Sequence, residues 1–450
     1  MSNELKPLHF DADYTMEEAL AEAKRCLNCP RPLCQMGCPI ENEIPRFIQA
    51  IAHGNFGLAN DILAERTNLP SICGRVCPRE NQCEGNCIMN KAKKPPINIG
   101  KLERFAADFE SINELRKPKK IQQNLGNVAV VGSGPAGLSV AGDMAKLGYK
   151  VTVFEGQSEP GGVLLFGIPE FRLSKSVVRR EIARLEGLGV KFVCNTFIGQ
   201  DKTLDELFAE GFDTIFIGTG THIPQEVRME NDEVHGVFQA MYLLTNVQLV
   251  ENGELDKDQI PVKKGDRVII IGGGNVAMDA ARTCVRLGCE SVTVAYRRSQ
   301  EQMPALLSEY EEARAEGVQF QWFASPVGVE GKDKVEGFKY EVMALNEDGA
   351  GIHGTGNFQV MPVDKIIIAA GHKPNARLIG EGNNLKVDEK GYIITSEDPY
   401  GMTNRKGVFA GGDVVHKPAT VVLAMREAKK AVDGMVKYME IKKAQESANQ

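Results

Sequence analysis

The chain has 450 residues, 25% of them charged, and a formal net charge of −7; at roughly 150 residues per domain this length suggests about three domains. The slightly acidic balance disfavours a general nucleic-acid surface. The polar first residues lack an apolar signal segment, and no stretch reaches the ~18 apolar residues that a membrane span needs. We therefore expect a cytoplasmic protein with no nucleic-acid and no membrane partner.

Residues 1–120 are predicted to form a helical, loop-rich domain that carries most of the cysteines. Thr15 followed by Glu18 matches a capping box that opens one helix. Residues 45–53, with Pro45 in the first turn, and residues 99–109 are expected to form two more helices. Eight of the 11 cysteines lie in two runs. The first run is Cys26, Cys29, Cys34 and Cys38, and the second is Cys73, Cys77, Cys83 and Cys87.

The two cysteine runs favour two 4Fe–4S clusters. Thiolates are soft ligands that suit such clusters, and disulfides are rare in the cytoplasm. In two-cluster ferredoxins the last cysteine of a run, followed by proline, serves the other cluster, and Cys38-Pro39 has this pattern. The alternative is structural zinc, whose sites usually offer two tight pairs of thiols rather than runs of four. The remaining Cys194, Cys284 and Cys289 are interpreted as buried core residues.

From about residue 121 the chain has the pattern of β-α-β units, with short apolar runs between longer helical stretches. Within it there is a near-repeat: the apolar runs 128–131 and 268–271 each precede a glycine turn and an amphipathic helix. We therefore expect an α/β fold with two Rossmann-like dinucleotide-binding domains, joined to the helical domain at the N-terminus.

The first glycine turn has the context of a dinucleotide site. Gly132 makes the turn, Gly134 lets the backbone approach a pyrophosphate, and Gly137 lets the helix pack on the strand. The helix N-terminus stabilises phosphate charge. Glu155 ends the next strand, where its carboxylate is expected to bind a ribose diol, as in FAD or NAD. The candidate residues of this turn are Gly132, Gly134, Pro135, Ala136 and Gly137.

The C-terminal part of the chain favours FAD for this first site. Residues 407–413 form an apolar run that ends in Gly411, Gly412 and Asp413, and a helix is expected from about Thr420. This is the second flavin signature of two-dinucleotide-binding flavoproteins, in which the aspartate contacts the ribityl–phosphate region and the helix N-terminus faces the isoalloxazine. The alternative is that Asp413 only caps a helix.

The second glycine turn favours NADPH. Counted from the first glycine, the position that matches Glu155 is Ala295, and Arg297 and Arg298 follow shortly after. A carboxylate there would repel a 2′-phosphate, whereas guanidinium groups can bind it bidentately. The alternative is that both arginines belong to a solvated strand end. The candidate residues of this turn are Gly272, Gly274, Asn275, Val276 and Ala277.

Hydride transfer requires the nicotinamide and the flavin to be nearly in contact, so the two nucleotide domains must face each other. The strand-plus-glycine segments 214–220 and 366–371, the second with Ala370 and Gly371, are expected to mark the crossings between domains. Residues 161–172, which include Gly162, either pack on the flavin or form a core hairpin. Since hydride transfer to a flavin needs no acid or base, we nominate no catalytic side chain. The expected domains are 1–120, 121–225 with 363–450, and 226–362.

These motifs together resemble one known family over nearly the whole chain, the small (beta) subunit of NADPH-dependent glutamate synthase. The resemblance is carried by the first cysteine run, residues 73–78, the Asn98-Ile99-Gly100 segment, both glycine turns and the end at Asp413. The same module occurs in the N-terminal half of dihydropyrimidine dehydrogenase and in the large subunit of the NADH-dependent ferredoxin:NADP oxidoreductase. The resemblance implies a subunit that passes hydride from NADPH to FAD and electrons through two 4Fe–4S clusters to a partner.

The resemblance also implies particular site residues. One cluster would be held by Cys26, Cys29, Cys34 and Cys87, and the other by Cys38, Cys77, Cys83 and Glu103. Spacing alone would choose Cys73 in place of Glu103, so the choice between them stays open. The family pattern further implies Arg172 near the flavin, Arg297 and Arg298 on the 2′-phosphate, and Asp413 and Thr420 on FAD.

The sequence also indicates what a partner would have to supply. Residue 2 is Ser rather than a nucleophilic Cys, and we expect no glutaminase domain and no third domain after Gln450. We therefore expect a partner chain, such as a large glutamate synthase subunit, to bind glutamine and 2-oxoglutarate. The alternatives are the large subunit of an electron-bifurcating ferredoxin:NADP oxidoreductase with a small ferredoxin-reductase-like partner, a free-standing NADPH:acceptor oxidoreductase, and a redox sensor without turnover.

Overall fold

The computed structural model describes residues 14–112, 121–347, 349, 351–374, 383–417 and 420–448. Contacts divide the chain into two units, and each is described by itself below. The large unit comprises Asp11–Leu165, Arg172–Ile223 and Lys373–Gln450, and the small unit includes Phe166–Phe171 and Pro224–His372. The chain passes between units after Ile223 and after His372, close behind the two strand-plus-glycine segments. Among the described residues, no helix has both the length and the apolar character needed to cross a bilayer.

The N-terminal part of the large unit is helical, as predicted. Thr15 Oγ1 accepts from Glu18 N at 3.2 Å and Glu18 Oε2 from Thr15 N at 2.8 Å, so the capping box is present. The core of this part includes Phe47, Ile51 and Leu102. The helices are α1 (Met16–Lys24), α2 (Leu33–Met36), α3 (Ile44–Ala52), α4 (Phe56–Arg66), α5 (Pro70–Val76), α6 (Ile88–Lys91) and α7 (Ile99–Ile112).

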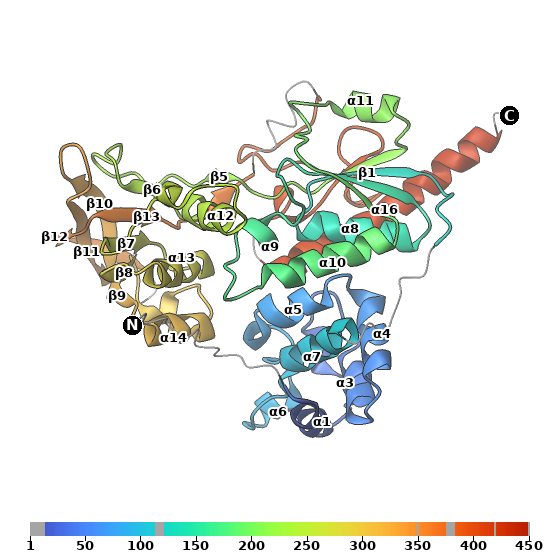
Figure 1. Ribbon diagram of the computed structural model, residues 1–450, viewed down its shortest axis with the longest axis horizontal. Helices are drawn as coiled ribbons and strands as arrows, with labels where there is room; N and C mark the ends of the chain where they lie inside the picture. The colour runs from blue at the N-terminus through green and yellow to red at the C-terminus, as the bar shows by residue number, and fades with distance from the viewer. Residues whose placement is uncertain are drawn as a thin grey trace. The chain divides into compact units, whose positions relative to one another are not determined.

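The rest of the large unit is built on a parallel five-stranded sheet of order β15-β4-β1-β2-β3. Figure 1 shows α8, α10 and α16 together below strand β1, and α11 above it. The strands are β1 (Asn127–Val131), β2 (Lys150–Phe154), β3 (Lys191–Val193), β4 (Thr214–Ile217) and β15 (Val408–Ala410). The helices are α8 (Pro135–Lys146), α9 (Val163–Phe166), α10 (Lys175–Gly187), α11 (Leu204–Ala209) and α16 (Val421–Ala448).

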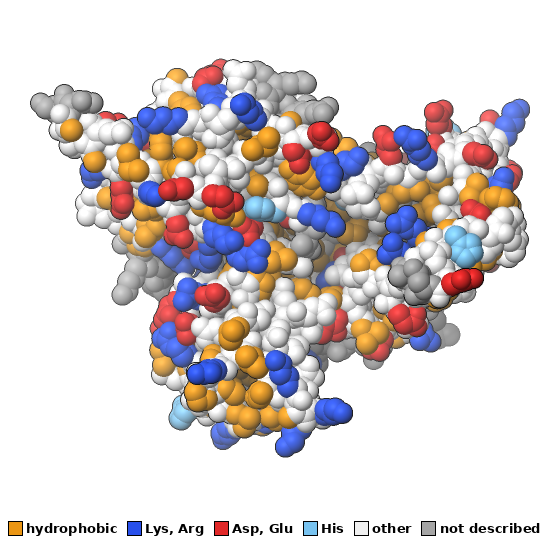
Figure 2. Space-filling view, turned by 180° about the vertical axis from the view of Figure 1, so that it is seen from behind, with side chains coloured by type: hydrophobic (Ala, Val, Ile, Leu, Met, Phe, Trp, Pro, Cys, Tyr) orange, Lys and Arg blue, Asp and Glu red, His pale blue; other side chains and the backbone are white. Residues whose placement is uncertain are grey.

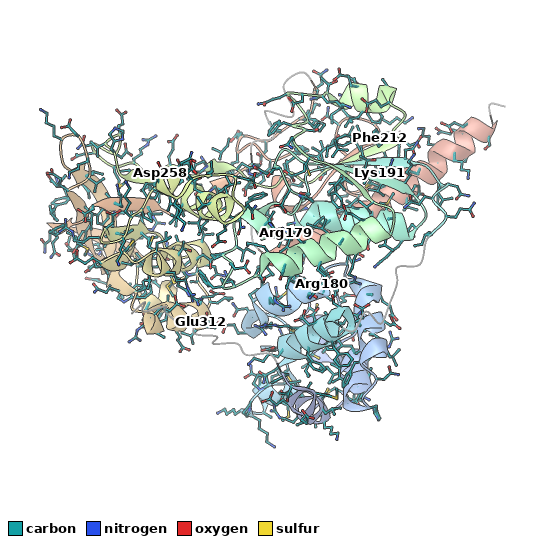
Figure 3. The ribbon with its side chains drawn as sticks, viewed as in Figure 1. Arg179, Arg180, Lys191, Phe212, Asp258 and Glu312 are labelled. Atoms are coloured by element: carbon teal, nitrogen blue, oxygen red, sulfur yellow. The ribbon has the colours of Figure 1, made fainter. Side chains whose placement is uncertain are left out.

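The helical part docks on α8 and α10 through polar contacts. Asn68 donates to Ser139 O at 3.1 Å and to Asp143 Oδ1 at 2.7 Å. Gly142 is needed there, because a Cβ at this position would lie 2.5 Å from the Asn68 side chain. On the neighbouring helix, Arg180 points toward the helical part (Figure 3) and donates to Asp108 Oδ1 at 2.6 Å.

The small unit contains a second parallel sheet of order β6-β13-β7-β8-β9 and an antiparallel sheet of order β10-β11-β12. Buried Arg282 on α13 bonds Glu316 at 2.8 Å and Glu312, which is labelled in Figure 3. The parallel strands are β6 (Val237–Gln239), β13 (Lys365–Ile368), β7 (Arg267–Ile271), β8 (Ser291–Tyr296) and β9 (Gln319–Trp322). The unit also contains β10 (Ala324–Glu330), β11 (Gly337–Leu345), β12 (Ile352–Pro362), α12 (Ala240–Glu251), α13 (Asn275–Arg286) and α14 (Leu307–Ala315). The short strands β5 (Ile223–Pro224) and β14 (His372–Lys373) pair with each other where the chain passes between units.

The hairpin alternative for residues 161–172 is wrong. Gly161 and Gly162 have φ of +141° and +52°, and this turn leads directly into helix α9. After α9 the segment joins the small unit, where Phe166 O accepts from Thr245 Oγ1 at 3.3 Å. The ring of Phe171 lies beside the guanidinium groups of Arg282 and Arg286, at 4.5 and 4.3 Å.

Candidate cofactor sites

Four thiols of the helical part line one small hollow that opens to solvent. They are Cys26, Cys29, Cys34 and Cys87, and the wall between them is apolar. Burial raises the pKa of the Cys34 thiol to about 11, so metal binding here must displace protons. The set joins three cysteines of the first run to the last one of the second run.

A second group lies deeper in the helical part. Glu103 is 8% exposed, and its charge acts on the thiols of Cys38, Cys77 and Cys83. Burial raises the pKa of the Glu103 carboxyl to about 8, although the positive charge of Arg79 lowers it. The carboxyl is therefore largely protonated at neutral pH, and a metal bound there would have to displace its proton.

Cys73 also touches this second group, but it has other contacts. Its thiol interacts with that of Cys77. It also lies 3.9 Å from Thr67 Oγ1 and 3.8 Å from the sulfur of Met425 on α16. Both Cys73 and Glu103 thus lie beside Cys77.

The donors of each group suit an iron–sulfur cluster. Thiolates are the soft ligands that such clusters prefer, and a 4Fe–4S cube spreads its ligands around several irons. Four thiols line the shared hollow, and the thiols of Cys38, Cys77 and Cys83 lie around Glu103 in the other group.

The Asn98-Ile99-Gly100 segment supports the second group. Gly100 N donates to Glu84 Oε1 at 3.0 Å. A Cβ on Gly100 would lie 2.0 Å from the side chain of Arg79. Glycine is therefore required there for the Arg79 guanidinium to approach α7, which carries Glu103.

The first glycine turn is closed by contacts between its own glycines. Gly132 has φ of +93°, and a Cβ on Gly137 would lie 1.9 Å from Gly132 O. A Cβ on Gly134 would meet nothing within 4 Å, which leaves the space where a pyrophosphate would approach. Pro135 and Ala136 begin α8 directly after it.

The carboxylate of Glu155 lies at this turn. Glu155 is 8% exposed, and its Oε2 accepts from the backbone N and from the hydroxyl of Ser133, the first at 3.0 Å. Its Oε1 accepts from Gln157 N at 2.9 Å. Sequence reasoning missed Ser133, although its place between the two turn glycines puts its side chain next to the end of β2.

Two distant segments meet the first turn. A Cβ on Gly162 would lie 2.9 Å from Gly134 Cα, and one on Gly412 would lie 2.8 Å from the Cβ of Ala136. Asp413 follows, and burial raises the pKa of its carboxyl to about 6. The alternative that Asp413 caps a helix is wrong, because Thr420 caps α16: its Oγ1 accepts from Leu423 N at 3.3 Å.

The second glycine turn has the same backbone plan. Gly272 has φ of +143°, and a Cβ there would lie 2.5 Å from Ala369 O, next to Ala370 and Gly371. Gly274 again faces open space. Asn275 Oδ1 accepts from Leu306 N at 3.0 Å, Val276 is half-buried and Ala277 is buried.

The register of the strands corrects the matching of Glu155 to Ala295. In the parallel sheet of the large unit Val131 pairs with Phe154, and in the parallel sheet of the small unit Ile271 pairs with Ala295. The residue equivalent to Glu155 is therefore Tyr296, since the turn after Gly288 has one residue more than the turn after Gly148. The acid is still missing, and a Cβ on Gly273 would lie 2.6 Å from the Tyr296 ring.

The remaining candidate residues are three arginines. Arg297 and Arg298 are exposed and follow β8 directly. Arg172 is half-buried in the large unit, shortly before α10. On the face seen in Figure 2, basic and acidic side chains are interspersed, and hydrophobic side chains gather on the helical part at the bottom of the view.

Comparison with known proteins identifies the family. Residues 6–115 match the family model for dihydropyrimidine dehydrogenase domain II, 4Fe–4S cluster. Residues 126–428 match pyridine nucleotide-disulphide oxidoreductase. The glutamate synthase [NADPH] small chain of Halomonas elongata is 37% identical, over 95% of this chain and 92% of that protein. The chain belongs to the glutamate synthase small-chain family.

Other members of this family and its fold relatives have different names. The Escherichia coli NAD-dependent dihydropyrimidine dehydrogenase subunit PreT is 34% identical, over 95% of this chain and 96% of that protein. Among solved structures, FprA of Mycobacterium tuberculosis superposes with a TM-score of 0.59, at 20% identity, over 72% of this chain and 86% of that one. That likeness shows the two-dinucleotide-binding fold.

Together these findings confirm the predicted fold class, family and cofactors. This small-chain family member is an NADPH-dependent oxidoreductase that uses FAD and 4Fe–4S clusters, with the nucleotide sites in the part matched from residue 126 and the clusters in the N-terminal part.

Proposed function

We propose that this chain is the NADPH-oxidising subunit of a glutamate synthase-type complex. It takes hydride from NADPH onto FAD and passes electrons through two 4Fe–4S clusters to a partner subunit. The observation that carries the proposal is the similarity to glutamate synthase small chains over nearly the full length of both proteins. Its cytoplasmic location stays a prediction.

In the proposed division of labour, residues 1–120 hold the clusters, the rest of the large unit holds FAD and the small unit holds NADPH. The expected boundary at 363 is wrong, because residues 363–372, with strand β13, belong to the small unit. When bound, NADPH would supply a hydride, FAD would accept it, and the clusters would carry single electrons. The protein's part is to bind and orient. Ser133 fixes the Glu155 carboxylate for a ribose, the open side of Gly134 admits a pyrophosphate, and the α16 N-terminus at Thr420 favours negative charge on the flavin. Arg297 and Arg298 would bind the 2′-phosphate.

In the helical part we propose the ligand sets that the family pattern implies. The shared hollow supports Cys26, Cys29, Cys34 and Cys87 as one set. The electrostatic contacts of Glu103 support it as a member of the other set with Cys38, Cys77 and Cys83. The outer wall of the hollow includes Leu27, which is 63% exposed. A cluster in this hollow would lie close to the protein surface, which suits electron transfer to a second protein.

The second ligand set is tested by exchanging the competing side chains one at a time. Cys73→Ser is expected to keep the iron and sulfide content of the anaerobically purified protein, while Glu103→Ala loses one cluster's worth of iron or changes its electron paramagnetic resonance signal. Cys194→Ser is the matched control. Loss of a whole cluster from Cys73→Ser, with Glu103→Ala unaffected, would show that Cys73 is the ligand.

The partner is tested by anaerobic capture of the tagged protein from its native cells, with bound proteins identified by mass. A large glutaminase-bearing flavoprotein is expected. A small ferredoxin-reductase-like flavoprotein would overturn the proposal in favour of an electron-bifurcating ferredoxin:NADP oxidoreductase. Capture of no partner, by protein that still reduces an artificial acceptor with NADPH, would favour a free-standing oxidoreductase.

A second candidate function is a subunit like PreT, which the 34% identity over nearly full length supports. The name of that relative specifies NAD rather than NADP. Steady-state oxidation of NADH and NADPH by the purified chain separates the two candidates. A clear preference for NADPH is expected from the exposed Arg297 and Arg298, and a preference for NADH would favour the PreT-like function.

A further inference from the structure

Two cysteines outside the cluster region share the C-terminal end of α13 in the small unit. Cys284 lies in the last turn of this helix, and Cys289 follows the helix-ending Gly288, which has φ of +84°. Cys289 N donates to Cys284 O at 3.2 Å. This is the long hydrogen bond of a Schellman motif, in which the two residues that it joins also bring their side chains together.

The same motif ends other helices of this protein with hydrophobic pairs. Tyr149 N donates to Met144 O at 3.1 Å after α8, and Val318 N to Ala313 O at 3.0 Å after α14. In each case a glycine with positive φ precedes the second residue. At the end of α13 a pair of thiols replaces the hydrophobic pair. The side-chain contact that only packs hydrophobic groups at the other helix ends therefore brings two reactive groups together here.

The two thiols differ in ways that suit stepwise exchange. Cys284 is fully buried, and Cys289 is half-buried at the surface of the same core. A hydrogen bond between the two thiols lowers the pKa of Cys289, whereas that bond and burial raise the pKa of Cys284. The sulfur of Cys289 also lies 3.8 Å from Lys263 O. Since the thiolate is the attacking form, the accessible Cys289 is the one that reacts first.

We propose that Cys284 and Cys289 form a reversible thiol–disulfide site that exchanges with small disulfides of the glutathione type. The Cys289 thiolate attacks one sulfur of the small disulfide, forms a mixed disulfide and releases one thiolate. The Cys284 sulfur, on losing its proton, then attacks the Cys289 sulfur and releases the second thiolate. The two protons of the protein thiols end on the two released thiols. The protein pair is thus oxidised by two electrons and the small disulfide is reduced.

This site is separate from the nucleotide site of the same unit. It lies at the opposite end of α13 from the glycine turn, about 18 Å away along a helix of 12 residues. Closure would tie the C-terminal end of α13 to the following turn without replacing any residue assigned to NADPH. The pair belongs to the small unit, whereas the cluster cysteines belong to the large one.

The full-length protein with its cofactors can be tested because trypsin separates the two cysteines. Cleavage after Arg282, Arg286 and Arg297 places Cys284 in peptide 283–286 and Cys289 in peptide 287–297. After anaerobic incubation with oxidised glutathione and blocking of free thiols, mass spectrometry is expected to find the two peptides joined by a bond that a reductant breaks. Cys194, whose charged neighbours are carboxylates, is the internal comparison and is expected to remain unlinked.

The single variants distinguish exchange from simple exposure. Cys284→Ser is expected to accumulate the mixed disulfide of glutathione on Cys289, and Cys289→Ser is expected to leave Cys284 unmodified. The proposal is overturned if the parent protein never yields the linked peptide although its unfolded form does. It is equally overturned if Cys194 and Cys289 of the parent each take up glutathione and stop at the mixed disulfide.

Discussion

The first glycine-turn unit (β1, α8 and β2) and the second (β7, α13 and β8) share the same order of strand, glycine turn, helix and strand. They differ in the side chains that lie between the turn and the end of the second strand. In the first unit the hydroxyl of Ser133 binds the carboxylate of Glu155. In the second unit the equivalent positions are Gly273 and Tyr296, and the ring lies against the glycine. A buried acid, already oriented by hydrogen bonds, suits a neutral ribose, whereas an aromatic ring followed by two arginines leaves room for an additional phosphate.

This difference shows that nucleotide choice depends on what stands at the end of the second strand, while the turn itself only brings the backbone close. Position 5 after the first glycine differs as well, because Gly137 in the first unit corresponds to Ala277 in the second. The four predictions below test this difference and the flavin site of the first unit, beginning with the largest effect.

Gly137→Ala is expected to abolish stable flavin binding. Its Cβ would lie 1.9 Å from Gly132 O, so the turn must open, at a cost of about 1–3 kcal/mol or more. Flavin affinity should fall at least roughly tenfold, measured as bound FAD per chain after gel filtration. Gly57→Ala, on α4 with open space around its Cβ, is the control and should keep its FAD. Full flavin content in Gly137→Ala would show that the turn relaxes freely.

Replacing Arg297 and Arg298 together by Ala is expected to weaken NADPH binding roughly 10- to 100-fold. One hydrogen bond to a charged group contributes about 1.5–3 kcal/mol, and solvent screening of these exposed side chains keeps the pair from contributing twice that. NADH binding should change little. The dissociation constants of both nucleotides, measured by flavin-fluorescence titration, check this. The control replaces both residues by Lys, which keeps the charge and loses bidentate geometry. Equal losses for NADPH and NADH would mean that the arginines act on structure and not on the 2′-phosphate.

Asp413→Asn is expected to stabilise the flavin-stripped protein at neutral pH by about 1–3 kcal/mol. Burial raises the pKa of Asp413 to about 6, above the ordinary aspartate value of 3.8. As pH rises from 4 to 6 the unfolded chain loses this proton first, so stability falls through that window and the full cost remains above it. Thermal midpoints of parent and variant should therefore coincide near pH 4 and separate toward pH 7. Parallel curves would show that the carboxyl is not desolvated.

Much of this fold could be predicted because its signals are local. Both glycine turns, their strands and the capping box at Thr15 depend on residues a few positions apart, and all are present. The match of Glu155 to Ala295 failed because counting cannot detect the extra residue after Gly288, which only strand pairing reveals. For the same reason, spacing could not choose between Cys73 and Glu103, because the helix that carries Glu103 approaches the cysteines only in three dimensions.

Contacts between distant segments were also beyond sequence reasoning. The fit of Asn68 against Gly142 joins the helical part to α8 across 74 positions of the chain (142 − 68), and neither residue carries a motif. The thiol pair of Cys284 and Cys289 was interpreted as core packing. The sequence nevertheless contained a signal for this pair. Gly288 ends a predicted helix, one cysteine follows it directly, and the other lies four residues before it.

The smallest expected effect comes from Ala277→Gly, which gives the second unit the glycine of the first. Glycine inside a helix costs about 0.5–1 kcal/mol relative to alanine, so the thermal midpoint should fall slightly. Ala277 is fully buried, and the turn before it differs from the first, with φ of +143° at Gly272 against +93° at Gly132. NADPH affinity should stay within about twofold of the parent. Removing the methyl group of Ala277 adds space beside the turn, and the turn already has the space that it needs. A gain in NADPH affinity would mean that the Ala277 side chain keeps the helix away from the phosphate of NADPH. The position shared by Gly137 and Ala277 would then limit phosphate binding in both turns.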